Sequence, residues 1–72
     1  MDKDYSILVM LNNNSIARLD HIPNADDIIS LGEDGNYRVE NVKHSYRLGP
    51  ENTIPKTYKI YQVQVFVRKS NF

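Results

Sequence analysis

The sequence predicts an all-β fold: a small, strongly bent barrel of five strands in a single domain over residues 1–72. Apolar residues alternate with polar ones, and almost none recur at helical spacing. Short runs rich in β-branched and aromatic residues are bounded by Asn, Asp, Gly and Pro, as strands are. One predicted strand changes the parity of its alternation partway along, and such bends are how a small sheet curls into a barrel.

The first half of the chain predicts three strands. Residues 5–11 are almost continuously apolar, which suits a strand that is covered on both sides or bends. Asn12–Ser15 is a turn, because Asn tolerates the left-handed conformation, and residues 16–22 form a second strand that Pro23 ends. After a turn at 24–27, in which Asp27 is expected to bond to backbone N–H groups, residues 28–31 form the third. A short helical turn from 24 to 31 is the alternative, disfavoured by its β-branched residues.

The second half predicts one bent strand, one long loop and one regular strand. Residues 32–36 form a turn around Asp-Gly. In the fourth strand, 37–46, Tyr37 and Val39 share one face, whereas Val42 and His44 have the opposite parity. A bulge or sharp bend is therefore expected at residues 40–41. Residues 47–57 form the longest loop, and residues 58–68 form the last strand.

Two segments carry a resemblance to a known kind of fold. Ile22-Pro23-Asn24-Ala25-Asp26-Asp27-Ile28-Ile29-Ser30-Leu31, followed by Tyr37-Arg38-Val39-Glu40-Asn41-Val42-Lys43-His44, resembles small SH3-like barrels with the pattern I-P-x-x-G-D-x-V-x-L and then Y-x-V-x-x-V-x-H. Many of these are short bacterial or phage proteins. Asp26 stands at the usual Gly position, and Asp tolerates the left-handed backbone that such a turn needs. The resemblance implies an SH3-like barrel and no particular activity. An OB-like barrel is the alternative.

The amino-acid composition and the distribution of charge limit the functions that this chain can have. The chain has no Cys, which excludes a disulfide, a thiolate metal site and a Cys nucleophile. No signal peptide or membrane span is visible, so a cytoplasmic protein is expected. The nine basic and nine acidic residues balance, but residues 1–36 hold seven acids and two bases, and residues 37–72 hold the reverse. Four of the five tyrosines also lie in the basic half.

No arrangement of residues indicates catalysis or a cofactor. His21 and His44 could approach each other only if their strands were neighbours, and two histidines rarely suffice for zinc. A half-buried, hydrogen-bonded His44 is the expected alternative. The carboxylate pairs 26–27 and 33–34 lie in turns, where general acid or base chemistry has no water-poor cleft. The sequence therefore predicts a non-enzymatic protein without a metal or cofactor.

The long loop provides the candidate site. If it folds back as a hairpin, tyrosines and cations crowd one end of the barrel, and the expected partner-binding residues are Lys43, Tyr46, Arg47, Lys56, Tyr58 and Lys59. Aromatic residues beside cations are typical of interaction surfaces. The leading hypothesis is a module that binds a protein partner, in the manner of a bacterial or phage accessory protein. Single-stranded nucleic acid is the alternative ligand, and self-association through the last strand, Ile60–Val67, is a third possibility.

Overall fold

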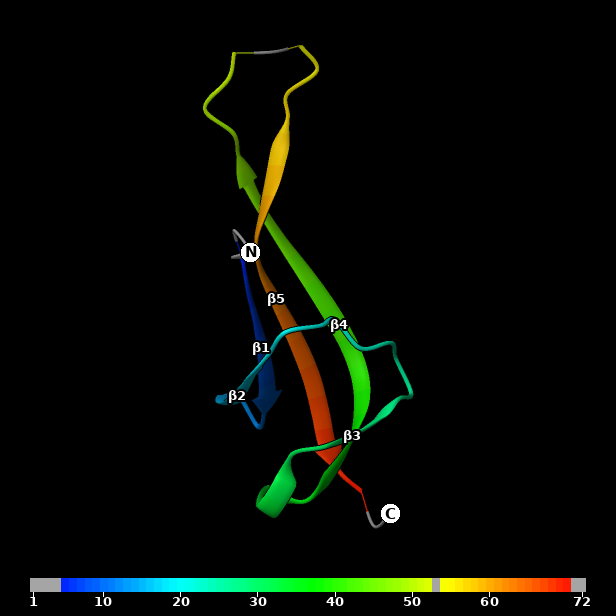
Figure 1. Cartoon of the computed structure of the whole chain (residues 1–72). Coiled ribbons are helices and arrows are strands. Elements are labelled where there is room, and N and C mark those ends of the chain that lie inside the picture. Colours follow the sequence, from blue (N-terminus) through cyan, green and yellow to red (C-terminus); the bar gives the residue numbers. More distant parts are fainter. Residues whose placement is uncertain (1–4, 53, 71–72) are drawn as a thin grey trace.

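A computed structural model of the chain describes residues 5–52 and 54–70. It contains five strands, β1 (Ser6–Leu11), β2 (Asn14–Leu19), β3 (Ile28–Ser30), β4 (Asn36–Leu48) and β5 (Tyr58–Lys69), and one 3₁₀ turn, η1 (Gly32–Asp34). The strands form one sheet in the order β2-β1-β5-β4-β3 (Figure 1). Neighbouring strands are antiparallel except β1 and β5, which are parallel. The predicted all-β, five-stranded class is confirmed.

Local turn chemistry sets the two hairpins of the N-terminal half. Asn12 and Asn13 both have positive φ, 51° and 68°, which makes the two-residue turn that matches the twist of a β-hairpin. Because the turn needs only these two residues, β2 begins at Asn14, earlier than expected. The predicted Asp-Gly turn is instead the 3₁₀ turn η1, in which the Leu31 N–H donates to the Gly35 carbonyl over 2.9 Å.

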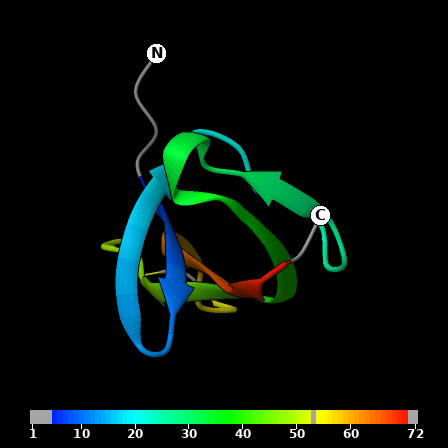
Figure 2. The same cartoon turned by 90° about the horizontal axis from the view of Figure 1, so that it is seen from below.

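The core lies on the inner face of the curled sheet. Its fully covered side chains come from the three central strands: Ile7, Val9, Tyr37, Val39, Val63, Val65 and Val67. Seen along the sheet, the strands surround this interior (Figure 2). Side chains of β2 and β3 pack at the margins of the core. β5 pairs with β1 on one side and β4 on the other, so its valines sit at the centre of the sheet.

The sheet curls at β-bulges, where one strand has one more residue than the strand paired with it. Val39 pairs with Val67 but Asn41 pairs with Phe66, so Glu40 is the additional residue in β4. This is the bulge expected at residues 40–41, and it places both Val39 and Val42 against the core. The register shifts at two further bulges. Tyr61 is the additional residue of β5 where it pairs with β4, and Ile16 is the additional residue of β2 where it pairs with β1. Bulges increase the local twist and bend of a strand.

The segment between β2 and β3 is tied to β4 by its backbone. Asp26 has the left-handed φ of 73° that was expected at this position. Its N–H donates to the Val39 carbonyl over 2.8 Å, and the Val39 N–H donates to the Asp27 carbonyl over 2.9 Å. The Asn24 N–H donates to the Asp27 carboxylate over 2.9 Å, which confirms the turn-holding role predicted for Asp27.

The sheet curls into a half-barrel and does not close. Closure would need β2 to pair with β3, and these strands are the two free ends of the sheet. A shallow hollow lies between them, lined by Leu19 of β2 and by residues 29–31. The predicted five-stranded barrel is therefore only half formed, because the sheet stays open between its two edge strands. β3 is only three residues long and offers β2 a short edge for pairing.

We expect Ile7→Ala to remove about 2–5 kcal/mol of unfolding free energy, because Ile7 is 1 % exposed and its loss leaves a cavity. This is a large part of the roughly 4–11 kcal/mol typical of a chain this size. Ile16→Ala, at a residue 37 % exposed, is the matched control and should cost much less. Urea unfolding followed by circular dichroism measures both, and equal losses would contradict the assigned core.

At position 26 the backbone conformation predicts opposite effects for two small residues. Asp26→Gly should preserve or raise stability, because Gly adopts positive φ without strain. Asp26→Ala should lower it and leave the Ala variant about 1–2 kcal/mol less stable than the Gly variant, the cost of a left-handed backbone with a Cβ. Thermal unfolding of the two variants tests this, and an Ala variant as stable as the Gly variant would exclude the left-handed turn.

Candidate functional site

The paired ends of β4 and β5 extend beyond the barrel as a two-stranded arm (Figure 1). We define the arm as residues 46–52 and 54–60. Its ladder consists of Tyr46 with Ile60, Arg47 with Lys59 and Leu48 with Tyr58, and the Gly49 N–H donates to the Thr57 carbonyl over 2.9 Å. The arm gives the molecule its elongated dimensions of 49 × 24 × 19 Å. The predicted hairpin at the long loop is thus present.

The inner face of β4 continues into the arm without cover. Along this face the side chains pass from the buried Val39 through the half-buried Val42 to the exposed His44. Tyr46 and Leu48, next on the same face, are 56 % and 52 % exposed. On β5 the buried Val63 gives way to a half-buried Ile60 and an exposed Tyr58. The face that builds the core therefore becomes an open apolar stripe, which we call the arm stripe: Tyr46, Leu48, Tyr58 and Ile60.

Cations accompany the arm stripe. Arg47 and Lys59 are directly opposite each other in the ladder, where like charges are unfavourable. The guanidinium carbon of Arg47 lies 4.9 Å from the centre of the Tyr61 ring, within the range of a cation–π contact. This ring is available because Tyr61 is the additional residue of the β5 bulge. The bulge therefore both bends the arm and positions one of its charges.

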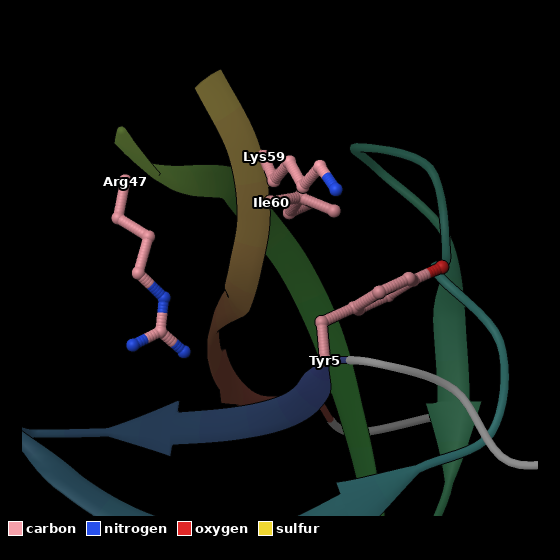
Figure 3. Close-up of a pocket in the computed structure, with 4 residues that line it drawn as sticks. All are labelled: Tyr5, Arg47, Lys59 and Ile60. Carbon is pink, nitrogen blue, oxygen red and sulfur yellow. The ribbon is translucent and has the colours of Figure 1, made fainter. Parts of the chain in front are cut away.

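A hollow of about 550 Å³ lies at the base of the arm, lined by Tyr5, Arg47, Lys59 and Ile60. Figure 3 shows Lys59 and Ile60 on one side of the β5 ribbon, above the Tyr5 ring, and Arg47 on the other side. The hollow combines an aromatic hydroxyl, an apolar wall and two cations. Its two cations suit a carboxylate, whereas Ile60 and the Tyr5 ring offer apolar contact.

The structure gathers part of the predicted partner-binding set. Tyr46, Arg47, Tyr58 and Lys59 all lie on the arm. Lys56 lies in the connection between the strands, beside a second hollow that Leu48 and Ile54 also line. Lys43 is not at this end: it pairs with Gln64 on the body of the sheet. The set is therefore divided between the arm and the barrel.

Three residues of this region did not follow from the sequence. Leu48 belongs to the arm stripe because β4 continues two residues further into the predicted loop. Ile60 lies within the predicted last strand, and the bulge at Tyr61 places it opposite Tyr46. Tyr5 lines the hollow because β1 runs parallel to β5 and begins beside the base of the arm. Apolar residues alternating at 46, 48 and then 58, 60 across a loop were the available signal for the first two.

The residues considered for metal or acid–base chemistry lie apart. β2, which precedes His21, and β4, which carries His44, are separated by β1 and β5. His44 is exposed, which corrects the expectation of a half-buried histidine; β3 pairs with β4 only at residues 36–38 and does not reach this part of the strand. Within residues 5–52 and 54–70, no three His or carboxylate residues gather closely enough to suggest a metal site.

The described part of the chain contains no helix with the length and apolar character that a membrane-spanning segment needs. No protein-family model matches this chain, and neither a curated protein nor a solved structure shows significant similarity to it.

The contact between Arg47 and Tyr61 should be measurable as a coupling energy. A double-mutant cycle with Arg47→Met and Tyr61→Leu should give about 0.5–1 kcal/mol, the value of an exposed cation–π pair. The cycle is read from urea unfolding of the four proteins. Replacing Tyr61→Leu by Tyr46→Leu gives a control cycle expected near zero. A zero value in the first cycle would contradict the stacked arrangement.

Proposed function

We propose that this protein is a non-catalytic interaction module that binds a protein partner through its arm. The observation that carries the proposal is the arm stripe, an apolar face continuous with the core in which Tyr46, Leu48 and Tyr58 are each more than half exposed. An isolated two-stranded ribbon is at best marginally stable in water. A partner that covers the stripe would supply the apolar packing that this two-stranded arm lacks.

The chemistry of the arm indicates the character of the partner. Tyrosine and arginine are enriched at interfaces and dominate their binding energy. Arg47 and Lys59 alternate with the stripe residues along the two strands of the arm, and Lys56 lies in their connection, whereas Glu51 is the single acidic residue among 46–52 and 54–60. We therefore propose a partner with an apolar groove bordered by acidic residues. Opposite charges around such a groove would raise the association rate more than the affinity.

Self-association through the last strand finds less support than the arm. β5 is paired on both sides along residues 62–66, so a second chain could reach it only by displacing β1 or β4. The longer free edge of this hairpin belongs to β4, which β3 covers only at residues 36–38, whereas β5 is free on its β1 side only outside residues 62–66. We accordingly place the partner on the arm and not along Ile60–Val67.

The SH3-like assignment is part of the same proposal. It is supported by the left-handed Asp26 at the Gly position of the pattern and by the bulge at Glu40 within the bent strand. Small barrels of this kind act in many unrelated processes. The SH3-like assignment therefore concerns the architecture only, and the proposed partner binding rests on the arm.

The test is capture of a partner by the purified chain from an extract of its source. Tyr58→Ser and Leu48→Ser should each weaken capture of the same protein by at least about tenfold, since a central interface side chain contributes about 2 kcal/mol or more. Ile28→Ser is the matched control, because Ile28 is 42 % exposed and lies on β3, away from the arm.

Circular dichroism of the three variants must show the same fold. Capture that survives both arm substitutions, or that Ile28→Ser weakens equally, would contradict the proposed surface. A partner whose binding is retained but whose association rate falls with Lys59→Gln would support the acidic rim.

A further inference from the structure

The charges of this neutral chain are separated between the strands and their connections. The strands hold seven basic residues, Arg18, Arg38, Lys43, Arg47, Lys59, Arg68 and Lys69, against one acid, Glu40. The described connections hold six acids, Asp20, Asp26, Asp27, Glu33, Asp34 and Glu51, against one base, Lys56. Folding therefore preserves the charge asymmetry of the sequence, and the sheet is its positive part.

Side-chain alternation puts four of these cations on the outer face of the sheet. Arg18 lies between Ala17 and Leu19, which pack on the core, so it points outward. Arg38 lies between the buried Tyr37 and Val39 and must do the same. By the same argument Lys43 and Arg68 face outward next to Val42 and Val67.

The strand register arranges the outer face in rows. One row crosses four strands as Arg18, Leu8, Gln64 and Lys43. Its two cations are separated by three strand spacings, about 14 Å. The next row holds Met10, Phe66 and Asn41, and the row beyond it holds Arg68 opposite Arg38. Phe66 is thus an aromatic ring, partly exposed, between two rows of cations.

These cations are poorly compensated. Arg38 and Arg68 are cross-strand neighbours, an arrangement that costs stability. The single ion pair of the described residues joins Arg68 to Glu40 at 4.0 Å, with both side chains about half exposed or more. Four cations therefore share one carboxylate. A polyanion would relieve this repulsion, and the acidic connections around the sheet would confine it to the outer face.

We propose that the outer face of the sheet binds single-stranded nucleic acid, with phosphates on Arg18, Lys43, Arg38 and Arg68 and a base stacked on Phe66. Single strands are bound in this way, by cations along the backbone and by aromatic rings under the bases. A duplex would use the cations but keep its bases away from the ring. This site is separate from the arm stripe and independent of the partner proposed there.

The experiment is fluorescence anisotropy of a labelled 12-nucleotide oligothymidylate or oligouridylate against the purified chain, over a salt series. We expect binding at 50 mM salt, with a log–log slope of about −3, because each phosphate contributes about −0.7 for single strands. Lys43→Gln and Arg18→Gln should each weaken binding and reduce the slope by about 0.7. Lys56→Gln, which removes one charge from the arm, is the matched control and should change neither.

Phe66→Leu tests the stacking. It should weaken binding about fivefold or more, since stacking on one base contributes about 1–3 kcal/mol, and leave the slope unchanged. Thermal unfolding shows whether Phe66→Leu is folded; the exposed Arg18 and Lys43 keep the test decisive if it is not. Absence of binding at 50 mM salt, equal losses with Lys56→Gln, or equal affinity for a duplex or inorganic polyphosphate would each overturn the proposal.

Discussion

The pairing of β4 with β5 is the interaction on which every other element depends. β1 reaches the sheet only through β5, β2 only through β1, and β3 only through β4. The same pairing brings Val39 and Val42 opposite Val67 and Val65, so it also assembles the centre of the core. A chain this short buries only about 60 % of its unfolded surface. Few side chains can be spared from that core, and all its fully covered ones come from β1, β4 and β5.

Because one hairpin forms both the core and the arm, the two bulges within it determine where one ends and the other begins. The additional Glu40 turns β4 around the core, and the additional Tyr61 turns β5 where β1 no longer accompanies it. Beyond that point the inner face keeps its apolar character but loses its cover. The two proposed surfaces follow from the same geometry: the arm stripe is the uncovered end of the inner face, and the cations occupy the outer face because the inner one is filled.

Local features of this fold were predictable from sequence, and long-range ones were not. The left-handed Asp26 was implied by the resemblance to small SH3-like barrels, in which this position is usually Gly. The turn bonded by Asp27 and the bulge at Glu40 follow from residue types or from alternation within about ten residues. The parallel contact of β1 with β5 joins residues more than fifty positions apart, and no local pattern specifies it. Lys43 was expected beside Tyr46 and Tyr58 for the same reason. Its position in the chain is close to theirs, but the register places it opposite Gln64 on the barrel.

The central claim is that one continuous strand pair has a covered half and an uncovered half. Hydrogen exchange of individual backbone amides, measured by NMR on the monomeric chain, tests this most directly. Amides at Val63 and Val65 should exchange only through global unfolding, because β5 is paired on both sides there. Paired amides of Tyr46–Leu48 and Tyr58–Ile60 should exchange at least about a hundredfold faster, through local opening of a two-stranded ribbon. Equal protection along the whole hairpin would contradict the account, since it would mean that the arm is as well covered as the core.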